Sequence, residues 1–195
     1  YLDCASGIAV NNLGHNHPHL VASLKAQVEK LWHVSNLYRI EGQELLASRL
    51  AAATGLDHVF FCNSGAEANE GAVKMARRYH HAKGDAERVT ILCAGGAFHG
   101  RTLGMLAATD RPAFREGFGP LATGFMHVPF GNLNELRNVM SEKIAAIFIE
   151  PVQGEGGANA APDGYLEGVR AAADEFGALV IADEIQCGMG RTGSL

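Results

Sequence analysis

Short apolar runs alternate with helical patterns through most of this chain, and this alternation limits the possible folds more than any other feature. Runs rich in β-branched and aromatic residues predict strands at 58–62, 89–93, 125–128, 144–149 and 179–182. Helical patterns separate them at 67–83, 133–142 and 165–176. Strands that alternate with helices predict a mainly parallel sheet covered on both faces. The chain is therefore expected to belong to the α/β class.

The first part of the chain shows helical patterns without intervening strands. Apolar spacing predicts helices over 20–32 and 42–53, the second ending at Gly55. Between 14 and 19 the chain alternates three histidines with Gly, Asn and Pro. This is either a metal-binding tract or a turn, and the turn is favoured because no carboxylate is near in the sequence. We expect an N-terminal segment over 1–40 and an α/β domain over 41–195.

Composition excludes several classes of function. Apolar residues make up 47% and charged residues 19%, which is typical of a globular protein. The net charge is −5 without a basic block, so no nucleic-acid partner is expected. The longest apolar runs are too short to cross a membrane, and no signal peptide is recognisable. The four cysteines lack Cys-x-x-Cys spacing, so they are expected to be reduced core thiols in a cytoplasmic protein.

Two carboxylates, Asp183 and Glu184, follow the run at 179–182 directly. A carboxylate at the carboxyl end of a parallel strand points into the crevice where open α/β sheets bind ligands. Burial of Asp183 there is unfavourable unless a cationic group lies opposite. One interpretation is that Asp183 faces the protonated ring nitrogen of a cofactor. The other is that it only accepts hydrogen bonds from loop amides.

The segment between the predicted strand at 58–62 and the next helix has the composition of a phosphate site. Ser64 and Glu67 have the spacing of a capping box, with Ser64 as the N-cap. Gly65 and Ala66 carry almost no side chain, so an anion could approach the free amides of the first turn. The alternative is an ordinary helix cap that binds nothing.

A glycine-rich segment also follows the predicted strand at 89–93. Phe98 lies between glycines, where its ring could stack on a planar ligand, and Arg101 could grip a carboxylate at two points. The alternative is a hydrophobic plug beside a surface arginine. His99 is a candidate general base, but no nucleophile is evident beside it in the sequence.

Two further patterns allow other readings. Glu150 and Glu155 could form a carboxylate pair of the glycosidase kind, although a solvated turn is the simpler interpretation. The run at 188–193 matches G-x-G-x-x-G, the fingerprint of dinucleotide-binding folds. In that fingerprint the glycines come directly after a strand, whereas here residues 183–187 intervene. A Rossmann-type NAD dehydrogenase is therefore kept only as an alternative.

Four motifs in this order resemble the class III aminotransferases: NSGAEANE, GGAFHGRT, EPVQGEGG and ADEIQCGMGRTG. The opening YLDCASGIAVNNLGHNHP is also similar, and the nearest resemblance is to the acetylornithine and succinylornithine aminotransferases. The resemblance implies pyridoxal 5′-phosphate (PLP), the type I PLP fold of aspartate aminotransferase, and a homodimer. Residues 41–195 would then be an incomplete PLP-binding large domain, without its C-terminal part and the small domain.

The resemblance also implies a role for each matching residue. These are cofactor contacts from Ser64, Gly65, Ala66, Phe98, Asp183, Ile185 and Gln186, and substrate contacts from Arg101 and Glu155. Asp183 would pair with the ring nitrogen and favour its protonated form, in which the ring accepts electron density from the substrate. Phe98 and Ile185 would pack on the two faces of the ring.

The family's Schiff-base lysine has no counterpart here, because its position lies beyond Leu195. The expected reaction moves the terminal amino group of N-acetylornithine, or of succinylornithine or ornithine, to 2-oxoglutarate, giving a semialdehyde and glutamate. Without the lysine, this chain alone is expected to be inactive. The alternative from another class is a non-catalytic fragment that binds PLP or a protein partner.

Overall fold

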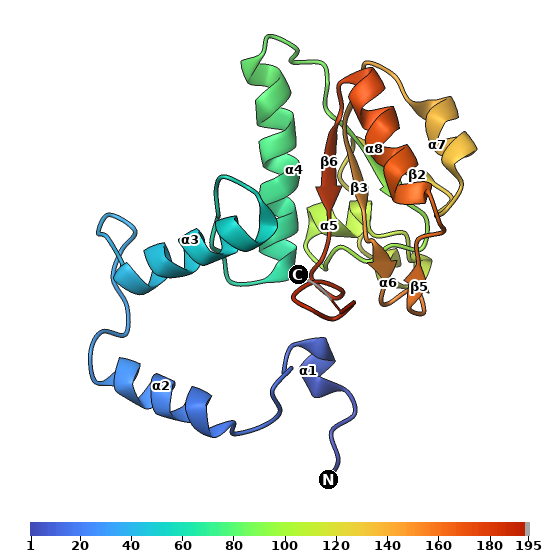
Figure 1. Ribbon diagram of the computed structural model, residues 1–195. Coiled ribbons are helices and arrows are strands. Elements are labelled where there is room, and N and C mark those ends of the chain that lie inside the picture. Colours follow the sequence, from blue (N-terminus) through green and yellow to red (C-terminus); the bar gives the residue numbers. More distant parts are fainter. Residues whose placement is uncertain (194–195) are drawn as a thin grey trace. The chain divides into compact units, whose positions relative to one another are not determined.

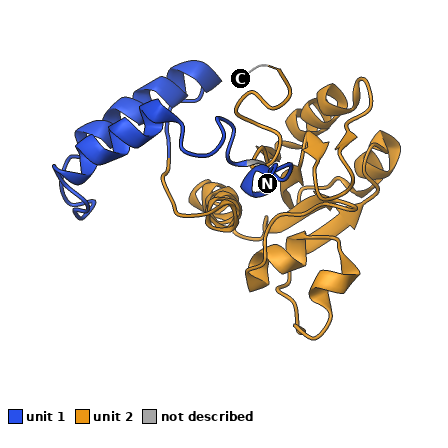
Figure 2. Cartoon of the chain, turned by 90° about the horizontal axis from the view of Figure 1, so that it is seen from below, with its two compact units in different colours: residues 1–59 blue, residues 60–195 orange. Residues whose placement is uncertain are grey.

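The computed structural model describes residues 1–193, in two compact units, Tyr1–Val59 and Phe60–Leu195 (Figure 2). These units are defined by contacts between residues and are not the domains expected from the sequence. The domain boundary expected between residues 40 and 41 therefore stays a prediction. Within the described residues, no helix is long and apolar enough to cross a membrane.

The first unit contains helices α1 (Ser6–Ala9), α2 (Pro18–Val28) and α3 (Glu41–Thr54). Proline suits the first position of α2, because its missing N–H would have no partner there. Gly55 ends α3 in the left-handed conformation and donates its N–H to Ala51 O at 2.9 Å. Both predicted helices are present, although α2 ends at Val28 instead of the predicted residue 32, and neither α2 nor α3 buries a residue.

The histidine tract of the first unit forms local contacts. His15 Nε2 lies 2.8 Å from Asp3 Oδ2, and His15 Nδ1 lies 3.1 Å from Asn11 Nδ2. Asp3 is twelve residues from His15 in the sequence, and the fold brings its carboxylate to the tract. Among the described residues, no group of three potential metal ligands gathers here or elsewhere.

The second unit is built on a parallel sheet, as predicted, so the α/β class is confirmed (Figure 1). Its strands run in the order β2 (Phe125–Val128), β1 (Thr90–Ala94), β3 (Ile144–Ile149), β6 (Leu179–Ala182). In the central register, Phe148 lies opposite Cys93 on one side and Ile181 on the other. All strands end at one edge of the sheet because every pairing is parallel.

Helices cover both faces of this sheet. On one face α4 (Gly65–Ala82) and α5 (Leu103–Ala108) pack against Phe148 and Ile91. On the other, α7 (Leu133–Val139) and α8 (Tyr165–Phe176) pack against Ile147 and Leu92. Every residue of β3 is buried, which explains why its sequence is a continuous apolar run instead of an alternating one.

Several sequence-based expectations fail in this unit. The strand predicted at 58–62 is absent: these residues have no regular secondary structure and pair with no described strand, and Phe60 is exposed. Short elements were missed: α6 (Pro112–Arg115) and the hairpin of β4 (Val152–Gln153) with β5 (Asn159–Ala160). Helix α7 stops before the predicted end at 142.

The cysteine expectation holds for only half of the cysteines. All four are free thiols, and Cys93 and Cys187 are buried, but Cys4 and Cys62 are exposed. Burial raises the pKa of the Cys93 thiol to about 12, so it stays protonated at neutral pH.

Candidate functional site

A cleft of about 280 Å³ opens where β1, β3 and β6 end and α4 begins. This is the carboxyl edge of a parallel sheet, the usual ligand site of α/β folds. The cleft is lined by Gly65, Ala66, Asn69, Phe98, His99, Gly100, Arg101, Glu150, Asp183, Ile185 and Gln186. Most of the candidate residues from three separate motifs thus share one cleft, whereas Ser64 and Glu155 are not in its lining.

The start of α4 has the predicted capping box. Ser64 Oγ accepts the N–H of Glu67 at 3.2 Å. The carboxylate of Glu67 accepts the N–H of Asn63 at 2.6 Å, one residue before the cap. The first N–H groups of an α-helix have no carbonyl one turn earlier, so the amides of Gly65 and Ala66 remain available for a ligand in the cleft.

Glycines allow three segments to meet at this helix start. A Cβ atom on Gly100 would lie 2.9 Å from the Cβ of Ala66, and Gly100 has a φ of 134° that side chains rarely adopt. A Cβ atom on Gly65 would lie 2.9 Å from Cγ2 of Ile185. The loops after β1 and β6 therefore both touch the first turn of α4.

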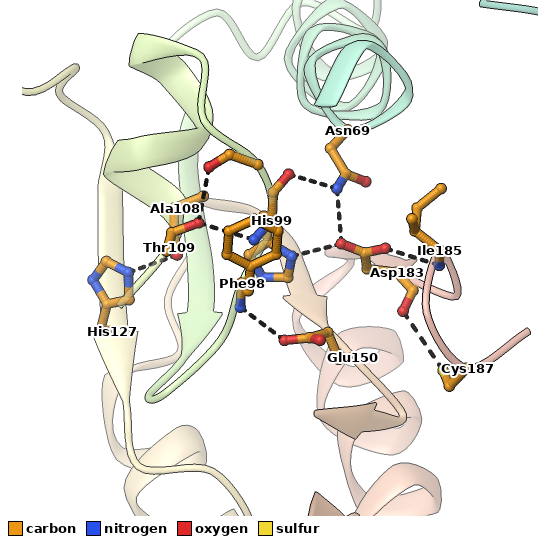
Figure 3. Close-up of polar contacts among 11 residues, drawn as sticks. Asn69, Phe98, His99, Ala108, Thr109, His127, Glu150, Asp183, Ile185 and Cys187 are labelled. Carbon is orange, nitrogen blue, oxygen red and sulfur yellow. Dashed lines mark hydrogen bonds and ion pairs between the residues drawn. The ribbon is translucent and has the colours of Figure 1, made fainter. Parts of the chain in front are cut away.

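Asp183 is buried directly after β6 and is held by three hydrogen-bond contacts (Figure 3). Its Oδ2 accepts Asn69 Nδ2–H at 2.7 Å and lies 2.8 Å from His99 Nδ1. Its Oδ1 accepts the N–H of Ile185 at 3.1 Å. The contact with the Ile185 N–H confirms that the carboxylate accepts a loop amide, whereas the cofactor interpretation stays a prediction for a residue that lines the cleft.

Asn69 is a site residue that the sequence reasoning missed, and His99, considered there only as a candidate general base, contacts Asp183 instead. The His99 ring stacks on Phe148 with centroids 3.7 Å apart, and its Nε2 is buried without a partner among the described residues. Asn69 also donates to His99 O at 2.8 Å. Asn69 comes four residues after Gly65, one helical turn along the same face, and that spacing was the available signal. The His99 ring supports the Asp183 carboxylate, and its backbone N–H donates to Thr109 Oγ1 at 2.9 Å.

Phe98 and Arg101 share a wall of the cleft. The Phe98 N–H donates to Glu150 Oε1 at 2.9 Å. The Arg101 guanidinium lies 5.7 Å from the centre of the Phe98 ring and 4.0 Å from that of Phe114. Among the described residues, Arg101 forms no ion pair.

The solvated-turn interpretation of Glu150 was wrong. Glu150 is buried, because the loop after β3 turns inward to receive the Phe98 amide. Burial raises the pKa of Glu150, and the hydrogen bond from Phe98 partly opposes that rise. Glu155 differs in being exposed, and its backbone oxygen accepts a hydrogen bond from Arg111. Glu150 lines the cleft and Glu155 does not, so the structure does not support the catalytic pair considered above.

The glycine run at 188–193 does not form a dinucleotide site. It consists of turns, with no helix opening within the described residues. The dinucleotide fingerprint requires its glycines to begin a helix, so the match is one of spacing alone. Gln186, just before the run, lies against Gly154 of the loop after β3.

Comparison with known proteins gives one consistent result. The family model described as aminotransferase class-III matches residues 1–195. The chain is 55% identical over 195 residues to acetylornithine aminotransferase of Mesorhizobium japonicum, covering all of this chain and 49% of that protein. It is 54% identical over 193 residues to the enzyme of the same name from Agrobacterium fabrum, covering 99% of this chain and 48% of that protein.

The structural comparison agrees. The solved structure of N-acetylornithine aminotransferase from Stenotrophomonas maltophilia matches with a TM-score of 0.84 and 41% identity, over 99% of this chain and 48% of that one. The chain spans about half the length of the curated relatives it matches.

Proposed function

This chain belongs to the class III aminotransferases, a family of PLP-dependent enzymes, and on that premise we propose the reaction of the whole protein. The whole protein transfers the terminal amino group of N-acetylornithine, or of succinylornithine or ornithine, to 2-oxoglutarate. The products are a semialdehyde and glutamate. The observation that carries the proposal is a single cleft containing the free amides of α4 and the buried Asp183.

The cleft suits PLP in its chemistry. The cofactor has an anionic phosphate at one end, and the first-turn amides of Gly65 and Ala66, ordered by the Ser64 cap, suit an anion. It has a basic ring nitrogen at the other end, and a buried carboxylate such as Asp183 suits its protonated form. Phe98 and Ile185 supply apolar surfaces for a flat ring.

When bound, PLP supplies an electron sink for the substrate carbon that loses its proton. The protein residues prepare this chemistry. Asp183 keeps the proton on the ring nitrogen, while Asn69 and His99 fix the orientation of its carboxylate. Gln186 lines the same cleft, and its proposed role is a contact with the phenolic oxygen of the ring.

Arg101 and Glu155 are the proposed substrate residues. Arg101 binds a substrate carboxylate, and its guanidinium is available for that role because it forms no ion pair among the described residues. Glu155 is proposed to lie near the substrate entrance and to pair with an arginine outside this sequence. The lining contains no lysine, so we place the Schiff-base lysine outside this sequence too and expect the 195-residue chain alone to be inactive.

We also propose that the protein works in the cytoplasm as a homodimer. Helices α2 and α3 expose apolar side chains and bury none within their unit, which favours a protein partner over solvent.

The experiment uses the gene product at the full length of its relatives. Purified with PLP, it should show a visible absorbance band of bound cofactor and form glutamate from N-acetylornithine and 2-oxoglutarate. Succinylornithine, ornithine and 4-aminobutyrate, tested in parallel, rank the donors. Bound PLP without turnover of any donor would support the non-catalytic alternative. Absence of both the band and glutamate would refute the proposal.

A further inference from the structure

Phe114 contacts two of the side chains proposed above to bind the cofactor and the substrate, Phe98 and Arg101. Its ring is half-buried on α6 and meets the Phe98 ring edge to face, with centroids 5.8 Å apart. The Arg101 guanidinium lies over the Phe114 ring, 4.0 Å from its centroid, closer than its 5.7 Å to the centroid of Phe98. One side chain thus contacts both the flat wall of the cleft and its cation.

Helix α6 is fixed in place by arginines on both sides of Phe114. Arg115 donates to the carbonyls of Leu106 at 3.1 Å and Ala107 at 3.2 Å, in the last turn of α5. Arg111 donates to the carbonyl of Glu155 in the loop after β3. The ring therefore rests on the same framework that carries the cleft, and it offers Arg101 a fixed surface.

An aromatic surface differs from a carboxylate in what it leaves for a ligand. A carboxylate beside Arg101 would neutralise the guanidinium and compete with a substrate. The face of a benzene ring attracts the cation through its quadrupole and leaves the charge uncompensated. A guanidinium stacked flat on a ring also keeps its N–H groups free at the edge, where they bind a carboxylate at two points. The contact with Phe114 thus orients Arg101 and leaves its N–H groups free to bind a substrate carboxylate.

We propose that Phe114 is a positioning residue that makes the enzyme selective for substrates with a carboxylate, because it holds the Arg101 guanidinium toward the cleft. The proposal rests on the role given to Arg101 under the proposed function. Loss of the aromatic face should weaken carboxylate binding and leave ligands without a carboxylate unaffected.

The test measures binding by calorimetry to the full-length protein loaded with PLP. N-Acetylnorvaline keeps the carboxylate and acetamido groups of N-acetylornithine but lacks the reactive amine. N-Butylacetamide lacks the carboxylate as well. Phe114→Leu should weaken N-acetylnorvaline binding about fivefold and leave N-butylacetamide unchanged. Phe114→Tyr retains the aromatic face and should restore the wild-type affinity.

Two further variants separate this inference from the proposed function. Phe118→Leu changes an exposed phenylalanine on the same segment and should alter neither affinity. Arg101→Gln should abolish the preference for the carboxylate. If Arg101→Gln retains the preference, the role of Arg101 is wrong. If Arg101→Gln loses the preference but Phe114→Leu keeps it, or Phe114→Leu weakens both ligands equally, the inference about Phe114 is overturned while the proposed function stands.

Discussion

At Gly100 the main chain passes against the start of α4 with no room for a side chain. Gly100→Ala would add a strained φ and a contact of 2.9 Å with Ala66, and should lower the free energy of unfolding by about 2–4 kcal/mol. Gly84→Ala is the matched control, because Gly84 has a φ of 90° but no atom near its Cβ position, and it should lower stability by about 1–2 kcal/mol. Chemical denaturation of the full-length protein checks both, and equal losses would contradict the packing argument.

Glu150 makes stability depend on pH in a defined direction. Burial raises its pKa above the ordinary value of 4.5, so the folded state binds more protons than the unfolded state, and stability falls as pH rises through this window. Gln at this position still accepts the Phe98 amide and carries no charge. Glu150→Gln should therefore raise the melting temperature at pH 7, with the gain disappearing below pH 4.5. The exposed Glu142→Gln is the control, and a gain independent of pH would contradict the assignment.

Site residues differ in how visible they are in the sequence. Asp183 and Phe98 follow apolar strands, so their placement at the carboxyl edge could be predicted. Asn69 and Phe114 could not, because one is an ordinary helical polar residue and the other lies on a four-residue helix. Asn69 contacts Asp183, which is 114 positions away, and Phe114 contacts Arg101, which is 13 positions away. Their significance comes from these contacts.

Among the elements, the N-caps offer a matched pair. Ser64 and Asn132 each accept the N–H of the third helical residue, at 3.2 Å and 3.1 Å, but only α4 opens toward the cleft. Ser64→Ala and Asn132→Ala should each lower the free energy of unfolding by about 1 kcal/mol. Only Ser64→Ala should also weaken PLP binding, measured by titration of the cofactor absorbance. A similar loss of PLP affinity in both variants would contradict the phosphate role of α4.

Elements were predictable where an apolar run or a helical apolar spacing extends over the whole element. The bounds of β2, β3, β6 and α8 agree with the sequence prediction. The segment 58–62 has strand composition, but strand structure also requires a hydrogen-bonding neighbour, which composition does not report. Helices α5 and α6 are short and lie next to glycine-rich chain, so their apolar periodicity is too brief to detect, and tertiary packing fixes them.

At the scale of the whole molecule, apolar side chains are distributed unequally. The second unit buries them in two clusters on the faces of its sheet. In the first unit, Leu20, Leu24 and Val28 follow helical spacing along α2 and are all exposed. An apolar stripe of this kind on a helix without a buried residue favours association with another protein surface.

The homodimer proposal can be tested on this stripe. Leu24 is 66% exposed, and burying a leucine at an interface is worth about 2 kcal/mol. Leu24→Asp in the full-length protein should therefore weaken the dimer at least tenfold, as measured by sedimentation equilibrium, because a charge would replace the apolar contact. Lys25→Glu changes the charge at the next position without removing apolar surface, and should leave the dimer intact. A wild-type protein that sediments as a monomer would contradict the proposal, whereas unchanged dimerisation of Leu24→Asp would remove α2 from the interface.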